Sequence, residues 1–146
     1  VDNITLRRKM QDTEAVIANK ENVGTPDDCV LLLEHLYNDR PSKKSSERCL
    51  SILRKTKKSL LNRIIPPDVP LANKPGGMAQ VRCDAGIVYL ARYPYAVSIQ
   101  TSFAEIGPEE QENYIVDLGL MIHSVMSTLD SSNDYGQGIS LLNRVA

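Results

Sequence analysis

Two segments of the chain place their apolar residues at helical spacing behind clear start signals. Thr25-Pro26-Asp27-Asp28 combines a capping hydroxyl, a proline suited to the first helical position and two acids for the positive end of the helix dipole. Gly107-Pro108-Glu109-Glu110 repeats this pattern without the hydroxyl. The apolar residues that follow each start fill one helix face: Cys29, Val30, Leu32, Leu33, Leu36 and Tyr37 in the first segment, and Tyr114, Ile115, Leu118, Met121, Ile122, Val125, Met126 and Leu129 in the second. The sequence therefore predicts helices over 26–38 and 108–130.

Three further helices are predicted from weaker patterns. Residues 3–22 carry a narrow stripe at heptad spacing, typical of a helix at the edge of a fold, formed by Leu6, Met10, Thr13 and Ile17. Residues 45–65 combine cations on one side with an apolar arc on the other, formed by Cys49, Leu50, Leu53, Leu60, Leu61 and Ile64. A short final helix is expected around Ile139, Leu141, Leu142 and Val145.

Residues 66–77 interrupt these helical patterns. They contain four prolines and two glycines, a composition unsuited to a helix or a central strand. We expect a loop here that separates two helical halves of one domain spanning 1–146. Because the chain begins with Val rather than Met, we also expect this domain to be excised from a longer protein.

Residues 78–104 fit two structures. After Pro94 the chain alternates with a period of two, which favours a strand with one apolar face, and its apolar positions are Tyr95, Val97, Ile99, Thr101 and Phe103. The nearest partner for such a strand begins at Gly86, which gives a β-hairpin near 86–104. The alternative is a helix on each side of Pro94. We prefer the helical alternative because the surrounding segments are helical and a lone hairpin is marginally stable.

The predicted fold class is mainly α. We expect one compact helical domain of about five to six helices, arranged as a bundle or in pairs that resemble armadillo/HEAT architecture, with at most the hairpin near 86–104. The side chains expected to be nearly buried are Leu33, Leu36, Leu53, Leu60, Ile64, Leu118, Ile122 and Val125. An apolar content of 42% and a length of 146 residues suffice for such a core.

Charge is strongly sorted along the chain. Residues 40–101 hold twelve Lys and Arg against three Asp and Glu, although the whole chain has a net charge of −1. Nine of these cations lie between Arg40 and Arg63, where Glu47 is the only acid. A helix stabilised by its own ion pairs would interleave the two signs, so the pattern indicates a basic face that binds an acidic partner.

Groups able to do chemistry are sparse in the sequence. Both histidines, His35 and His123, fall opposite the apolar faces of their helices, and no CxxC, HxxxH or HExxH spacing occurs. Lys74-Pro75-Gly76-Gly77 resembles part of a phosphate loop but lacks the GxxxxGK[ST] spacing, so we interpret it as a proline-set turn. The sequence therefore predicts neither an enzyme, nor a cofactor, nor a metal site.

The predicted function is that of a non-catalytic scaffold or adaptor domain. Its basic helical face would dock an acidic, partly apolar segment of another protein; a homodimer is a further option. The alternative is a nucleic-acid-binding domain that uses residues 43–63. The partner-binding residues are expected to be Lys43, Lys44, Arg48, Ile52, Arg54, Lys55, Lys58 and Arg63. Three cysteines at wide spacings favour an intracellular protein, cytoplasmic or nuclear, and no apolar run is long enough to cross a membrane.

Overall fold

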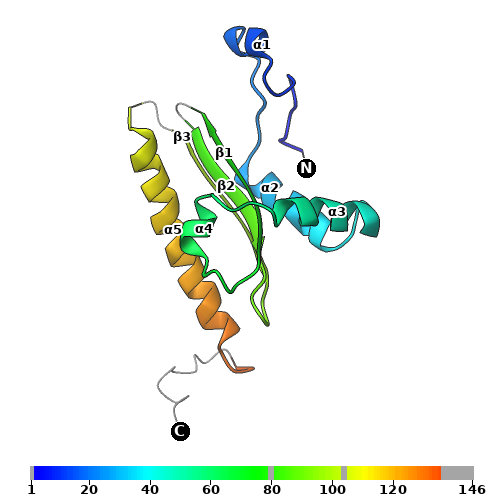
Figure 1. The fold of residues 1–146 in the computed structure, drawn as a ribbon, viewed down its shortest axis with the longest axis vertical. Helices are drawn as coiled ribbons and strands as arrows, with labels where there is room; N and C mark the ends of the chain where they lie inside the picture. The colour runs from blue at the N-terminus through cyan, green and yellow to red at the C-terminus, as the bar shows by residue number, and fades with distance from the viewer. Residues whose placement is uncertain (1, 79–80, 103–104, 136–146) are drawn as a thin grey trace.

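A three-stranded antiparallel sheet forms the centre of the molecule (Figure 1). The computed structural model describes residues 2–78, 81–102 and 105–135. Its strands are β1 (Leu71–Met78), β2 (Val81–Val88) and β3 (Tyr95–Ser102), in the spatial order β1-β2-β3. The register pairs Leu71 with Val88 and Val88 with Tyr95, so consecutive strands are joined at alternate ends of the sheet.

Helices cover both faces of this sheet. The long α5 (Pro108–Asp130) and the short α4 (Leu61–Ile64) lie on one face, and α2 (Pro26–Tyr37) and α3 (Lys43–Leu53) lie on the other (Figure 1). The five-residue α1 (Thr13–Ile17) stands apart from the sheet, at the top of Figure 1.

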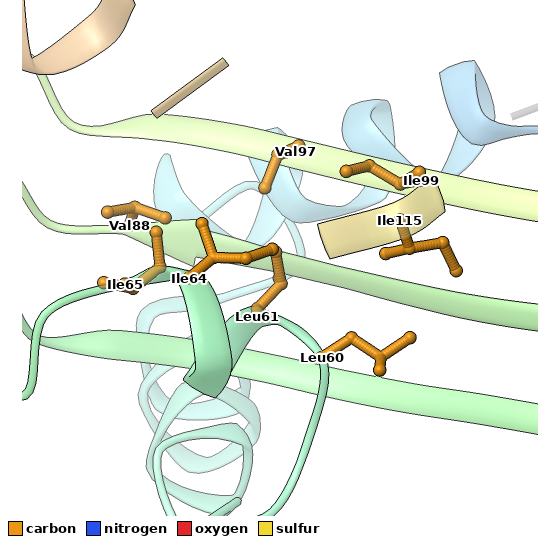
Figure 2. Close-up of a cluster of buried hydrophobic side chains, with 8 residues drawn as sticks. All are labelled: Leu60, Leu61, Ile64, Ile65, Val88, Val97, Ile99 and Ile115. Carbon is orange, nitrogen blue, oxygen red and sulfur yellow. The ribbon is translucent and has the colours of Figure 1, made fainter. Parts of the chain in front are cut away.

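The larger of two apolar clusters joins α4 and α5 to the sheet. Figure 2 shows its members, which converge from four elements and the segments beside them: Leu60, Leu61, Ile64, Ile65, Val88, Val97, Ile99 and Ile115. Gly119 permits this packing, because a Cβ there would lie 2.4 Å from the Cδ1 of Ile64. The second cluster joins α2 and α3 to the opposite face of the sheet and contains Leu33, Leu50, Ala72 and Ile87.

The prediction of a mainly α domain, as a bundle or as armadillo/HEAT-like pairs, is wrong. The chain from Leu71 to Ser102 forms the sheet, so the strand alternative was correct for Tyr95–Ser102. The partner strand is Val81–Val88 rather than a strand starting at Gly86. The loop expected over 66–77 ends at Pro70, since β1 is an edge strand and such a strand tolerates proline.

Two predicted helices are also corrected. Only Thr13–Ile17 of residues 3–22 is helical, and an isolated bridge pairs Thr5 with Val23. The basic helix expected over 45–65 ends at Leu53 and resumes as the single turn α4. Between them, Thr56 Oγ1 donates a hydrogen bond of 2.8 Å to the carbonyl of Asn73 and thereby holds the connection on β1. The final helix expected over 139–145 lies outside the described residues.

The helices with local start signals are confirmed. Thr25 Oγ1 accepts a hydrogen bond of 3.1 Å from the backbone N–H of Asp28 at the start of α2, and α5 begins at Pro108. The predicted core was partly wrong. Leu33, Leu60 and Ile64 are buried and Leu36, Leu53 and Ile122 are half-buried, but Leu118 and Val125 on α5 are 47% and 61% exposed.

Candidate active site

The segment Asn73-Lys74-Pro75-Gly76 lies on β1, at an edge of the sheet among the described residues. Side chains alternate between the two faces of a strand. Lys74 and Gly76 therefore share the face covered by α2 and α3, where they pair with Ala85 and Cys83 of β2. The Lys74 side chain is exposed, and its Nζ donates to the carbonyl of Pro75.

An apolar groove of about 580 Å³ opens beside Lys74. Its walls come from α2, α3 and the sheet, and its lining includes Cys29, Leu32, Leu33, Leu36, Cys49, Ile52, Leu53, Lys74, Pro75, Gly76, Cys83 and Gln100. We call it the lysine groove. Lys74 is the only charged side chain among the described residues that line it. The exposed ammonium group of Lys74 thus places one positive charge at an otherwise apolar groove.

A buried polar network fixes the strand that carries Lys74. The amide Nδ2 of Asn73 donates to Asp84 Oδ1 at 2.8 Å and to Ser59 Oγ at 2.7 Å. The other carboxylate oxygen of Asp84 accepts the backbone N–H of Leu61 at 2.9 Å, at the start of α4. Asn73 and Asp84 are both fully buried. This network couples β1, β2 and α4 directly behind Lys74, so it orients the strand without contacting the groove.

The three cysteines converge on the lysine groove from three elements: Cys29 from α2, Cys49 from α3 and Cys83 from β2. All are free thiols. Burial, together with the charge of Asp84, raises the pKa of Cys83, whose Sγ lies 3.5 Å from the carbonyl oxygen of Gly76. No cluster of three or more metal-binding side chains occurs among the described residues.

A second concavity, which we call the basic cleft, lies at the outer side of Pro75–Gly77. It has a volume of about 570 Å³ and is lined by Lys57, Lys58, Ser59, Leu60, Asn62, Arg63, Pro75, Gly76, Gly77, Arg82, Cys83 and Glu112. Glu112 pairs with Arg82 at 3.3 Å and with Arg63 at 3.6 Å. Four cations thus face one carboxylate in the cleft.

The predicted partner-binding residues do not form one surface. Lys58 and Arg63 line the basic cleft, whereas Ile52 is 56% exposed and lines the lysine groove. Lys55 is exposed after the end of α3, and Arg54 lies over the ring of Tyr89, with 4.8 Å from its Cζ to the ring centroid. Lys43, Lys44 and Arg48 lie exposed along α3. Partner binding by these eight residues remains a prediction.

Comparison with known proteins identifies the class of the chain. A family model described as the beta-lactamase enzyme family matches residues 1–126. A comparison with curated protein sequences gives no match.

Solved structures share the fold at low sequence identity. A variant of PBP-A, solved as an acyl-enzyme complex with penicillin G, is 20% identical, with a TM-score of 0.76 over 88% of this chain and 48% of its own. A beta-lactamase from Chitinophaga pinensis is 22% identical, with a TM-score of 0.73 over 86% and 51%. A class A beta-lactamase from Bacteroides cellulosilyticus is 18% identical, with a TM-score of 0.72 over 90% and 50%. The chain therefore spans about half the length of the structures that it matches.

These matches correct the functional prediction. A non-catalytic scaffold domain is wrong, because the matching family is one of enzymes, and so is the nucleic-acid-binding alternative. The expectation that the protein is not an enzyme fails for the same reason. Among the described residues no helix combines the length and apolarity needed to cross a membrane. The intracellular location stays a prediction.

The missed signal is Lys74-Pro75-Gly76. Class A β-lactamases and penicillin-binding proteins combine the motifs S-x-x-K, S-D-N and K-T-G. Lys74-Pro75-Gly76 matches the third motif except that Pro75 replaces the threonine. The prediction of a proline-set turn at Lys74-Pro75-Gly76-Gly77 is wrong, because these residues lie on strand β1. In the fold the tripeptide lies on a sheet edge beside an open groove.

Proposed function

The chain belongs to the beta-lactamase enzyme family. We propose that it forms part of the active site of an enzyme whose serine is acylated by the carbonyl group of a β-lactam. The observation that carries this proposal is the position of Lys74-Pro75-Gly76 on an edge strand, with Lys74 open to the lysine groove. The acyl-enzyme that the PBP-A variant forms with penicillin G is the corresponding chemistry in a protein of the same fold.

Lys74 supplies positive charge to the reaction. Its ammonium group lies where it can attract the carboxylate of a β-lactam and lower the energy of negative charge that develops during acyl transfer. The buried pair of Asn73 and Asp84 keeps the strand, and with it Lys74, in a fixed position.

The backbone of β1 offers a hydrogen-bond donor for the developing oxyanion. The carbonyl of Asn73 faces away from β2, since it accepts the hydroxyl of Thr56 outside the sheet. Backbone groups alternate along a strand, so those of Pro75 and Gly77 face the same outer edge. Pro75 has no N–H, which leaves the N–H of Gly77 as the next donor at this edge.

The proposal assigns the nucleophile to a part of the fold that this sequence does not contain. Neither S-x-x-K nor S-D-N occurs in the sequence. The structures that match the chain are about twice its length, so the part of the fold they contain beyond the match has room for these motifs. The proposal places the serine and its activating lysine across the lysine groove from Lys74.

Pro75, which stands where the motif has threonine, changes how the site can bind a substrate. Proline has neither a side-chain hydroxyl nor an N–H, so this position donates no hydrogen bond to the substrate. Binding of a β-lactam carboxylate then depends on Lys74, the only charged side chain among the described residues that line the groove.

The test measures hydrolysis and acylation of benzylpenicillin by the complete gene product, with Lys74→Ala beside the control Lys44→Ala, an exposed lysine on α3. We expect Lys74→Ala to lower kcat/KM by about 100-fold or more, as when an oxyanion-stabilising group is removed. Lys44→Ala should keep wild-type activity. Equal activity of both variants, or no acylation and no turnover of any β-lactam by the wild type, would contradict the proposal.

A further inference from the structure

We propose that the basic cleft binds a second anionic group of the substrate, separate from the one that Lys74 attracts. This inference rests on the proposed function, since it extends the substrate class to β-lactams that carry two negative charges. Its basis is the placement of four cations from three parts of the fold around one concavity: Lys57 and Lys58 before α4, Arg63 on α4 and Arg82 on β2.

The charges in the cleft do not cancel internally. Glu112 is the only acidic residue among the described residues that line it, and its carboxylate is shared by Arg63 and Arg82. Arg82 is further engaged by the carbonyls of Met78 and Val81. By contrast, none of the ion pairs between described residues involves Lys57 or Lys58.

Other cations of the chain are used differently. Arg40 pairs with Glu34 at 2.9 Å, Arg92 pairs with Asp134 at 2.9 Å, and Arg54 lies over an aromatic ring. Lys43 and Lys44 are exposed at the start of α3 and line none of the concavities described above. Lys57 and Lys58 therefore differ from them in facing a concavity that already holds two guanidinium groups. Repulsion between gathered cations is relieved when an anion binds among them.

The cleft adjoins the place proposed for the substrate. Its walls include Pro75, Gly76 and Gly77, the same part of β1 that offers the outward N–H of Gly77. Lys74 does not line it, because the Lys74 side chain lies on the other face of the sheet. A substrate seated along the edge of β1 would thus meet Lys74 at the lysine groove and the other cations at the basic cleft. The two anion-binding positions are distinct and can be tested separately.

The ligand chemistry is that of a carboxylate. Ammonium and guanidinium groups together with the side-chain amide of Asn62 suit a small oxyanion. The cleft volume of about 570 Å³ leaves room for a carboxylate and for part of the substrate that bears it. No stacking aromatic side chain lines the cleft among the described residues, so a nucleotide base has no platform here.

The first test compares two penicillins that differ by one carboxylate: benzylpenicillin, with a single carboxylate, and carbenicillin, with a second one on its side chain. The quantity is the ratio of kcat/KM for carbenicillin to that for benzylpenicillin, measured with the complete gene product. In the double variant Lys57→Gln, Lys58→Gln we expect this ratio to fall about tenfold, as for the loss of charge-assisted hydrogen bonds. The control Lys43→Gln, Lys44→Gln removes the same charge from α3 and should leave the ratio unchanged. An equal ratio in wild type and double variant overturns the inference.

A second test does not need turnover. Binding of inorganic phosphate to the complete gene product is followed by isothermal titration at low ionic strength for the wild type and the same two double variants. We expect the Lys57, Lys58 variant to bind phosphate at least about fivefold more weakly, and the Lys43, Lys44 variant to bind as the wild type does. If the wild type shows neither acylation by nor turnover of any β-lactam but does show this difference, the proposed function fails while the anion site stands. If phosphate binding is absent or insensitive to Lys57 and Lys58, the anion site fails whatever the activity.

Discussion

The side-chain amide of Asn73 donates a hydrogen bond of 2.8 Å to the carboxylate of Asp84, and both side chains are fully buried between the sheet and α4. The same carboxylate receives the backbone N–H of Leu61, so one acid ties two strands and a helix together. Asn73 immediately precedes Lys74. The charged residue of the proposed active site is therefore positioned by a polar pair on the opposite face of the sheet.

Replacing Asp84 with Ala should destabilise the protein strongly. The change leaves the N–H of Leu61 without its partner, and the amide of Asn73 keeps only Ser59. Because buried donors without acceptors are costly, we expect a loss of about 2–5 kcal/mol in the free energy of unfolding. Chemical denaturation measures it. The control is Asp117→Ala, at an exposed position on α5, which should change stability by less than about 0.5 kcal/mol. A similar loss of unfolding free energy in both variants would mean that the buried hydrogen bonds of Asp84 do not stabilise the fold.

Gly86 should not tolerate a side chain. A Cβ at this position would lie 2.5 Å from the Cβ of Asn73 and 2.8 Å from the carbonyl oxygen of Ala72. Since part of this clash is with backbone, Gly86→Ala should cost about 3 kcal/mol in thermal or chemical unfolding. Gly107→Ala serves as the comparison, because an added Cβ there meets nothing within 4 Å. It should cost less than about 1 kcal/mol. Equal stability of the Gly86 variant and wild type would contradict the close strand packing.

Truncations on α5 should separate the face that packs on the sheet from the outer face. Ile115 is fully buried and lies in the larger apolar cluster. Ile115→Ala should therefore lower the free energy of unfolding by about 2–5 kcal/mol. Val125 is 61% exposed, and Val125→Ala should change the free energy of unfolding by less than about 0.5 kcal/mol. Denaturant unfolding of the two variants gives both values. The reverse order would show that α5 is rotated relative to the orientation described.

His123 should make stability depend on pH. Desolvation by burial lowers the pKa of its imidazole, whose Nδ1 lies 2.9 Å from the hydroxyl of Tyr95 and whose Nε2 lies 3.3 Å from that of Ser127. Burial also raises the pKa of Tyr95 to about 12, so this hydroxyl stays protonated. The folded protein protonates His123 only at a lower pH than the unfolded chain, which takes up this proton near pH 6.5. Stability from this residue is therefore complete above about pH 6.5 and falls as the pH drops through that value towards the lower folded pKa.

The measurement is the midpoint of thermal unfolding between pH 8 and pH 5 for the wild type and His123→Gln. Glutamine does not titrate, so the wild type should lose more stability than the variant over this interval. Parallel curves would show that His123 is equally solvated in both states.

Local sequence signals determined two of the main helices. α2 and α5 each begin with a proline at the first turn, followed by acids and then an apolar face. These interactions join residues within a few positions of one another, so neighbours along the chain suffice to predict where the helices start. The face of α5 was harder to predict. Apolar residues surround more of this helix than the sheet and α4 cover, which leaves Leu118 and Val125 exposed.

The formation of the edge strand β1, and of the proposed site on it, depends on tertiary contacts. Residues 71–78 contain Pro75, Gly76 and Gly77, which taken alone favour a loop; they form β1 because β2 pairs with them along their whole length. The break after Leu53 likewise follows from contacts of Thr56 with Asn73 and of Leu61 with Asp84, which are distant in sequence. The sequence by itself determined the clustering of cations in residues 40–101 and the tripeptide Lys74-Pro75-Gly76. Only the sheet separated Lys74 from Arg82, because alternate side chains of a paired strand point to opposite faces, and Arg82 shares the basic cleft with Lys57, Lys58 and Arg63.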